Sequence, residues 1–283
     1  MSNRKNARAT SAPTPTSRDL EIIRTVCLHG ALTREQLRHL CFRKQVGLAS
    51  VQAACRRLKL LVERGYLDRL RVPTIMGSGP YIYLPAPGSR VALTDDERDL
   101  ATRGRRTRIS SLAEIKHGLE VVDFYVALKE GLASQGGRVI VWLSEREVHY
   151  ALPGRGRSLP FTPDAYCLWL LGEEEGAFFL EWDRGTESMT RIAEKLARYE
   201  KYYGLRAYRE HLGEQGLRPR LLFVLNDERR RSQVGKWLAR RLADGRWPSL
   251  PTIFLAVQDD ALAEPLGAIW TQLGQEGTAR FLD

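Results

Sequence analysis

The sequence contains no apolar run long enough to cross a membrane. One of its longest, residues 166–171 (YCLWLL), is far shorter than the ~18 to 20 residues that a membrane-spanning helix needs. The first residues are polar, and no apolar segment of the kind found in a signal peptide follows them. We therefore expect a cytoplasmic protein with no membrane contact.

Cysteine is scarce, and its spacing matches no metal or disulfide pattern. The four cysteines include no CxxC pair and the five histidines are scattered, which argues against a zinc knuckle and a disulfide framework. Positive charge is abundant, with 44 Lys+Arg against 34 Asp+Glu. Residues 1–111 hold 21 Lys+Arg against 9 Asp+Glu, whereas residues 112–283 hold 23 against 25. A localised cationic surplus favours a polyanionic partner, because each neutralised phosphate releases counterions. We expect double-stranded DNA.

The length of 283 residues is sufficient for two domains. Residues 1–16 are polar, basic and rich in Pro, Ser and Thr, and predict a disordered arm. Residues 17–84 predict three helices and then a hairpin with a Gly/Pro-rich tip, an order typical of a winged helix-turn-helix DNA-binding domain. A winged helix can also serve as a protein-binding module, but the charge of this segment favours DNA. Residues 85–111 predict a linker.

The third of these helices, about residues 49–64, has an apolar face and an opposite face that is polar and basic. We expect the polar face to enter the major groove. Side chains predicted to reach base edges are Ser50, Gln52, Arg56 and Lys59. Side chains predicted to contact phosphates are Arg43, Lys44, Arg57, Arg69 and Arg71.

Residues 112–283 predict a second domain that begins with a long, largely apolar helix. Strands are predicted at 138–143, 164–171, 177–183, 221–225 and 252–257, with further helices at about 187–203 and 232–243. The order αβββαβαβ indicates an α+β or α/β fold in which a mixed sheet is flanked by helices.

This order resembles the restriction-endonuclease-like, or PD-(D/E)XK, core. Asp164 opens one predicted strand, and Glu181 and Asp183 close the next. The resemblance implies that these three carboxylates bind Mg²⁺ and act in phosphodiester hydrolysis. The pattern places a lysine two residues after the glutamate, where this chain has Asp183. Two substitutes for that lysine remain open, Lys195 on the next predicted helix and Arg184.

The strand register decides whether the carboxylates can meet. A hairpin centred on Glu174 places Asp164 on the opposite sheet face from Glu181 and Asp183. A shift of one residue brings all three to one face. The sequence alone leaves this register open.

A second resemblance rests on the helix-turn-helix segment, on His117, on Pro163-Asp164-Ala165, and on residues 178–188 (FFLEWDRGTES) followed by Lys195 and Tyr199. At these positions the chain resembles the replication-relaxation family, which is encoded on bacterial plasmids and integrative elements. The resemblance implies a role in plasmid replication or in relaxing or mobilising plasmid DNA, with replication or conjugation proteins as partners.

Three functions remain open from the sequence. The preferred one is a DNA-binding accessory protein whose nuclease-like domain lacks the standard catalytic lysine, because Asp183 stands in its place. The second is a Mg²⁺-dependent nuclease or nickase that uses Asp164, Glu181 and Lys195. The third is a transcriptional regulator whose C-terminal domain dimerises. The sequence does not fix the oligomeric state.

Overall fold

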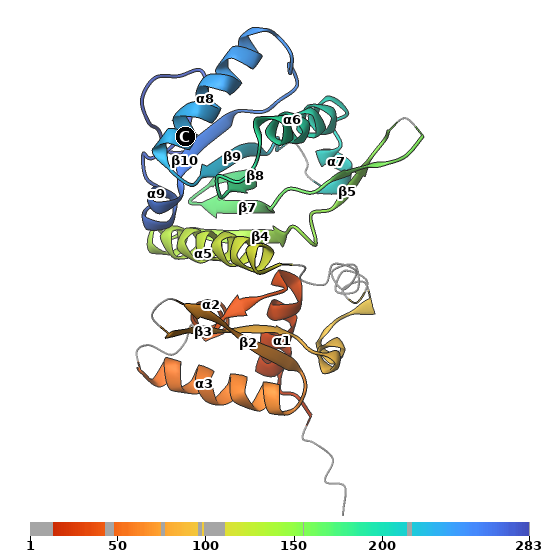
Figure 1. Ribbon diagram of the computed structural model, residues 1–283, viewed down its shortest axis with the longest axis vertical. Helices are drawn as coiled ribbons and strands as arrows, with labels where there is room; N and C mark the ends of the chain where they lie inside the picture. Colours follow the sequence, from red (N-terminus) through yellow and green to blue (C-terminus); the bar gives the residue numbers. More distant parts are fainter. Residues whose placement is uncertain are drawn as a thin grey trace, which may run out of the picture. The chain divides into compact units, whose positions relative to one another are not determined.

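The computed structural model describes residues 14–42, 48–74, 77–95, 98, 111–154, 156–213 and 217–282. The chain divides into two compact units, Met1–Asp99 and Leu100–Asp283. Figure 1 shows helices and a small sheet in the first unit, and a larger sheet between helices in the second. Within the described ranges, no helix is both long enough and apolar enough to cross a membrane.

In its described ranges, unit 1 contains α-helices, a small antiparallel sheet and a short 3-10 helix. The helices are α1 (Ser17–His29), α2 (Arg34–Cys41) and α3 (Leu48–Glu63). The strands are β1 (Leu32–Thr33), β2 (Leu67–Thr74) and β3 (Gly77–Pro85), in the order β1-β3-β2. The 3-10 helix η1 (Pro87–Ala92) follows β3.

The first two helices begin where a side chain caps the free backbone amides. Thr16 caps α1 together with Asp19, and Thr33 with Gln36 caps α2. Gly30, at a φ of 79° that favours glycine, follows the end of α1. The buried side of α3 presents Ala54, Leu58 and Leu61. The opposite side of α3 therefore remains available for contacts outside the unit.

Unit 2 is built around a six-stranded mixed sheet in the order β11-β10-β9-β8-β7-β4. Its strands are β4 (Arg138–Ser144), β7 (Ala165–Leu171), β8 (Glu174–Asp183), β9 (Arg220–Leu225), β10 (Ile253–Val257) and β11 (Thr271–Gln272). Pairing is parallel for β8–β9 and β9–β10, and antiparallel for the rest. The prediction of a mixed sheet flanked by helices is confirmed.

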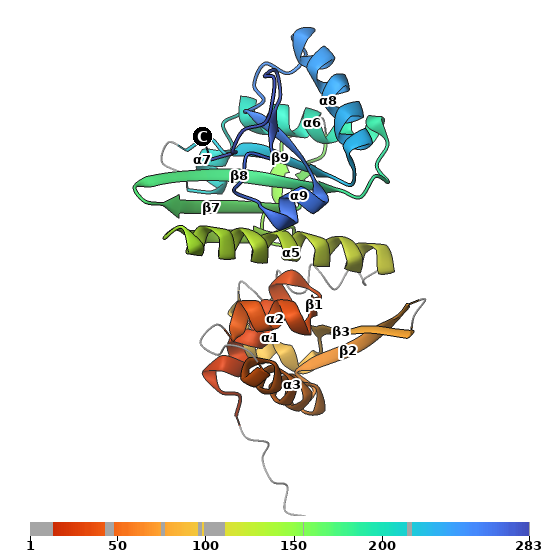
Figure 2. The same cartoon turned by 90° about the vertical axis from the view of Figure 1, so that its left-hand side faces the viewer.

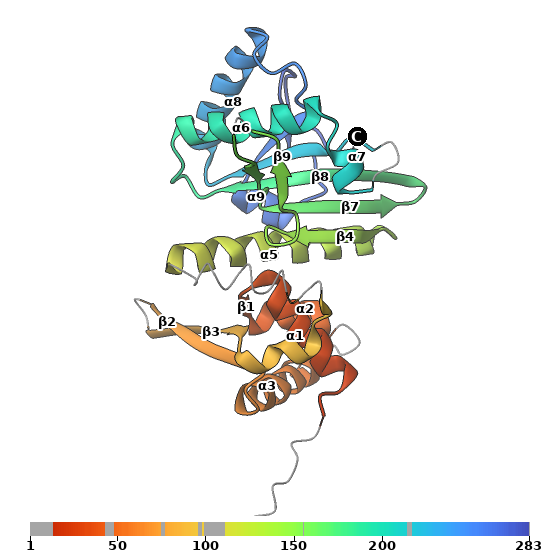
Figure 3. The same ribbon diagram turned by 90° about the vertical axis from the view of Figure 1, so that its right-hand side faces the viewer.

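The helices of unit 2 are α5 (Leu112–Ser134), α6 (Met189–Gly204), α7 (Tyr208–His211), α8 (Glu228–Ala243) and α9 (Gln258–Ala263). Figure 2 and Figure 3 show α6 and α8 on one face of the sheet and α5 on the other. Each face has its own apolar core: Phe179, Leu196 and Val234 belong to the α6–α8 side, and Phe124, Phe178 and Trp270 to the α5 side. Alternate residues of β8 thus enter different cores.

A small hairpin of β5 (Tyr150–Leu152) and β6 (Leu159–Phe161) lies between β4 and β7 in the sequence. The sequence analysis missed this hairpin, as it missed α7, α9 and β11. These elements are short, and a strand of three residues is too brief to show an alternating pattern. Phe161 stacks on Tyr202 of α6 at 4.0 Å between ring centroids, which fixes the hairpin on the α6 side.

The structure decides the register of β7 and β8, which the sequence leaves open, against the pairing centred on Glu174. Leu171 pairs with Glu174, so that the turn is the dipeptide Gly172-Glu173, with Gly172 at a φ of 63°. At the other end Ala165 pairs with Leu180, and the Asp164 backbone amide donates to the Leu180 carbonyl at 3.1 Å. Continuing this register places Asp164 opposite Glu181, at the edge where β8 ends.

Candidate functional site

The side of α3 that faces away from the core of unit 1 carries Gln52, Arg56 and Lys59, all exposed. Lys59 also lies 3.7 Å from the carboxylate of Glu63, a contact too exposed to neutralise it strongly. Three side chains that the sequence assigns to base reading therefore share one solvent-facing helix surface.

Of two other predicted contacts of α3, Ser50 is wrong and Arg57 has partners within the unit. The Ser50 side chain is fully buried, because it lies on the side of the helix that enters the core. Arg57 is engaged inside the unit: its Nε lies 2.5 Å from Asp19 Oδ1 and its Nη2 donates to Thr16 Oγ1 at 2.6 Å. The carboxylate of Asp19 is almost completely buried. Arg57 therefore joins α3 to the start of α1, and its expected phosphate contact stays a prediction.

The β2–β3 ribbon exposes two of the other predicted cations. Arg69 and Arg71 lie over the ring of Tyr81, at 4.6 and 4.0 Å from its centroid. Such stacking orients a guanidinium group while leaving its N–H donors available. Arg43 and Lys44 lie outside the described residues.

A groove of about 570 Å³ lies beside α3. It is lined by Thr16, Ser17, Arg18, Phe42, Ala53, Arg56, Arg57 and Leu60. Arg18, which sequence reasoning missed, is exposed and lies 5.7 Å above the ring of Phe42. No local pattern marks Arg18, because it comes from α1 and meets α3 only in the folded unit. The groove adds a second helix to the cationic surface.

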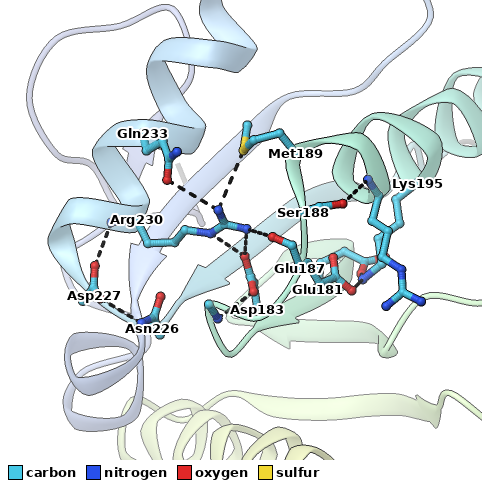
Figure 4. Close-up of polar contacts among 12 residues, drawn as sticks. Glu181, Asp183, Glu187, Ser188, Met189, Lys195, Asn226, Asp227, Arg230 and Gln233 are labelled. Atoms are coloured by element: carbon cyan, nitrogen blue, oxygen red, sulfur yellow. Dashed lines mark hydrogen bonds and ion pairs between the residues drawn. The ribbon is translucent and has the colours of Figure 1, made fainter.

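In unit 2, Glu181 is the centre of a buried polar cluster. Its Oε2 accepts a hydrogen bond from Lys195 Nζ and its Oε1 accepts one from Tyr199 OH, each at 2.7 Å. Lys195 also lies 2.9 Å from Glu187 Oε1. Figure 4 shows Lys195 of α6 directed toward Glu181 on β8. Lys195 and Glu181 therefore form a largely buried ion pair.

Asp164 occupies the neighbouring position with both oxygens engaged. Its Oδ1 lies 3.1 Å from His117 Nε2 of α5, and its Oδ2 accepts from the Trp182 backbone amide at 2.7 Å. The His117 side chain is therefore directed from α5 toward Asp164. Asp164, Glu181 and Lys195 meet at one edge of the sheet.

Burial and mutual charge shift the pKa values of this cluster. Burial raises the pKa of Glu181 to about 7, since Lys195 offsets this only in part and the charge of Asp164 adds to it. Burial acts in the same direction on Asp164, but Lys195 and His117 hold its pKa below the usual value. Burial would lower the pKa of Lys195, yet the surrounding carboxylates raise it. The pKa of Glu145 is raised, first by burial and then by Asp164. Sequence reasoning did not single out Glu145.

Asp183 belongs to a different set of contacts, which corrects its expected role as a third metal ligand or base. Its Oδ2 accepts from Arg230 Nε at 2.8 Å, and its Oδ1 accepts from the Gly185 backbone amide at 2.7 Å. Arg230 also donates to the Glu187 carbonyl. Figure 4 shows Asp183 directed toward α8 and not toward Lys195. Asp183 therefore fastens the end of β8 to the start of α8.

Every carboxylate oxygen of Asp164 and Glu181 contacts a donor in this structure. A Mg²⁺ ion bound here would therefore have to replace at least one of these contacts. In the part of the chain that is described, no group of three or more His, Cys, Asp or Glu side chains could hold a metal ion.

Most of the distinctive segment 178–188 serves to hold helices together. The Trp182 indole donates to Glu120 of α5 at 3.0 Å, and Arg184 donates to the same carboxylate at 3.2 Å. Gly185 takes a φ of 76°, and a β-carbon there would lie 2.8 Å from the side chain of Asn226. The Ser188 side chain caps α6. The segment thus positions Lys195 relative to Glu181.

Comparison with known proteins gives one family. The family model described as replication-relaxation matches residues 23–217, which is more than half of the chain. No curated protein matches the sequence. The chain is similar to a structure of the restriction endonuclease FokI, with 12% identity and a TM-score of 0.30. That match covers 89% of this chain and 44% of the FokI chain, and at this TM-score it establishes no common fold.

Proposed function

The chain belongs to the replication-relaxation family, and from this membership we propose that it binds double-stranded DNA. We propose that it acts in the replication, relaxation or transfer of plasmids or other mobile elements. Replication or conjugation proteins are the proposed partners.

The single observation that carries DNA binding is the exposed polar face of α3. Gln52, Arg56 and Lys59 point away from the core, as base-reading side chains of a recognition helix must. Gln suits adenine and Arg suits guanine in the major groove. Arg18, Arg69 and Arg71 flank that face as phosphate contacts.

We interpret unit 1 as a winged helix within residues 17–84, with the β2–β3 ribbon as its wing. Helix α2 precedes the recognition helix α3, and the strand order β1-β3-β2 supports this interpretation. Residues 112–283 form the second proposed domain. The linker expected at 85–111 begins later than the sequence suggests, because Ala86, Ser89 and Leu93 are buried and the Gly88 amide donates to the Gly65 carbonyl of unit 1 at 3.1 Å.

We interpret the second domain as a restriction-endonuclease-like core used for binding or assembly without cleavage. The register that places Asp164 opposite Glu181, with Lys195 on the next helix, favours descent from a nuclease. The presence of Asp183 at the standard lysine position, and its engagement by Arg230, support the loss of cleavage.

DNA binding is tested by selecting a preferred duplex from a random pool with the full chain. Arg56→Ala should then reduce discrimination between that duplex and an arbitrary one by ~1 to 3 kcal/mol, whereas Arg69→Ala should weaken both alike and lower the salt slope by about 1. A full chain without salt-dependent affinity for any duplex would refute the proposal. Binding confined to promoters would instead favour a transcriptional regulator.

Cleavage is the second candidate function, and supercoiled plasmid tests it. We expect no nicking in the presence of Mg²⁺. Nicking that disappears in both Asp164→Ala and Glu181→Ala would show that the domain is a nuclease or nickase after all. Nicking that persists in both variants would indicate a contaminant.

A further inference from the structure

Helix α8 of unit 2 exposes a row of basic side chains. Arg229, Gln233, Lys236 and Arg240 are all exposed, and their spacing of four, three and four residues places them along one side of the helix. Val234 and Leu238, on the opposite side, are fully buried against the sheet. Within the described ranges, no ion-pair partner contacts Arg229, Lys236 or Arg240. We call these three cations the α8 row.

The other two arginines near the start of α8 have internal partners. Arg230 binds Asp183 at the end of β8. Arg231 pairs with Glu228 at 2.7 Å and donates to Thr271 of β11. These contacts neutralise the only acidic residue of α8, Glu228, and anchor the helix to the sheet. The positive charges of the α8 row therefore have no acidic partner on the helix, and the helix that carries them is anchored to the sheet.

The net charge of residues 112–283 does not reveal this row, because acidic residues elsewhere in the domain offset it. Helix α8 holds six Lys+Arg and one acidic residue, whereas the rest of residues 112–283 holds 17 Lys+Arg against 24 Asp+Glu. A solvated helix face ordinarily intersperses acids with bases at i,i+4 spacing. The α8 row departs from that pattern on a domain that is otherwise acidic.

We propose that the α8 row is a second DNA-contacting surface that binds the phosphate backbone of duplex DNA without reading its sequence. This inference rests on the proposed function, because it takes DNA to be the ligand of unit 1. It goes beyond that function by giving unit 2 a contact of its own.

The dimensions of the row suit a duplex. Arg229 and Arg240 are eleven residues apart, which at 1.5 Å per residue is about 16 Å along the helix. Duplex DNA carries one negative charge per about 1.7 Å of its axis, so the row faces several phosphates at once. The row holds no apolar side chain that a protein interface would bury, and three cations with one amide are the donors that phosphate oxygens accept.

The test compares full-chain variants on a duplex of arbitrary sequence, with affinity measured by fluorescence anisotropy over a series of salt concentrations. The α8 variant combines Arg229→Gln, Lys236→Gln and Arg240→Gln. The matched control combines Arg138→Gln, Arg157→Gln and Arg209→Gln, three exposed arginines away from α8. A charge-conserving variant combines Arg229→Lys, Lys236→Arg and Arg240→Lys. A unit 1 variant combines Arg56→Gln, Arg69→Gln and Arg71→Gln.

Loss of three phosphate contacts should reduce the slope of log K against log salt by about 2 to 3 in the α8 variant. The slope should change little in the control, and the charge-conserving variant should retain the wild-type slope. An α8 variant with the wild-type slope overturns the inference, and so does a control whose slope falls as much as that of the α8 variant. The unit 1 variant tests the proposed function separately. If the α8 variant loses affinity and the unit 1 variant does not, the proposed role of α3 fails and the α8 row stands.

Discussion

Neighbouring arginines of α3 have opposite roles. Arg56 is exposed and lines the groove beside α1, whereas Arg57 pairs with the buried carboxylate of Asp19. A buried carboxylate that loses its cation retains its desolvation cost without compensation. Substitutions at these adjacent positions should therefore affect different properties, DNA binding at Arg56 and stability at Arg57.

We expect Arg57→Met to destabilise the packing of α1 on α3 by about 2 to 3 kcal/mol, a value reduced from that of a fully buried pair because Arg57 is partly exposed. Arg56→Met should change stability by no more than about 0.5 kcal/mol while weakening DNA binding. Hydrogen exchange of α1 peptides measures the first effect. Equal protection of α1 in both variants would contradict the assigned role of Arg57.

The elevated pKa of Glu181 makes the stability of unit 2 depend on pH. Between the usual glutamate pKa and about 7, the folded state retains a proton that the unfolded state has lost, so the free energy of unfolding falls as pH rises. The fall attributable to Glu181 is about 3 kcal/mol across that window. Glu181→Gln should flatten this part of the profile.

Tryptophan fluorescence during urea unfolding at pH 5 and pH 8 measures this effect, because all six tryptophans lie in unit 2. Tyr199→Phe serves as a control that removes a hydrogen bond to Glu181 without removing the titrating group. If wild type and Glu181→Gln lose equal stability between the two pH values, the titrating group is not Glu181.

The sequence identified Asp164, Glu181 and Lys195 as a group, since each occupies a fixed place in a resembled motif. It could not identify Arg230 or Asp19 as partners of Asp183 and Arg57, because those contacts join segments 47 and 38 residues apart. Ser50 is different, because its spacing of four, eight and eleven residues from Ala54, Leu58 and Leu61 already places it on the core face of α3. Side-chain partners depend on packing that no local pattern records.

At the scale of elements, the sequence predicted the long helices and the strands of the central sheet from hydrophobic periodicity. It misplaced the β7–β8 turn, because three consecutive glutamates suggested a wider loop than the dipeptide Gly172-Glu173. The register that the sequence left open decides which side chains meet, since a shift by one residue moves a side chain to the other face of the sheet.

Two turn glycines provide a test of how the site is positioned. Gly172 and Gly185 both have positive φ, but a β-carbon meets nothing at Gly172 and lies 2.8 Å from Asn226 at Gly185. Gly172→Ala should cost about 1 to 2 kcal/mol, the penalty of the left-handed conformation alone. Gly185→Ala should cost at least about 1 kcal/mol more from crowding, as measured by tryptophan-monitored unfolding.

Asn226→Ala provides the matched control for this comparison. In the Gly185→Ala background it should recover the crowding part of the loss, because it removes the atoms that the new methyl group meets. In the Gly172→Ala background it should recover nothing. Recovery in both backgrounds would mean that Asn226 is itself destabilising and that crowding at Gly185 is not the cause.

At the scale of the whole molecule, the net charges of residues 1–111 and 112–283 predicted DNA contacts in the first third of the chain alone. The folded chain qualifies this view, because the acidic remainder of unit 2 masks the basic side of α8 in any sum over residues 112–283. Binding to a polyanion depends on the charge of the surface that meets it, and not on the net charge of the domain. A domain with no net positive charge can therefore still present a cationic row to a polyanion.

If both units contact DNA, the second contact is intramolecular once the first has formed, and the linked affinities multiply through effective concentration. Shortening the duplex from about three helical turns to about one, roughly 10 base pairs, should then lower both the affinity and the salt slope of the wild-type chain. The α8 variant should show a much smaller change with length, after correction for the number of overlapping sites. Anisotropy titrations of both proteins on both duplexes measure this. An equal dependence on length in the two proteins would mean that unit 2 makes no contact of its own, and that α3 with its flanking arginines accounts for all of the binding.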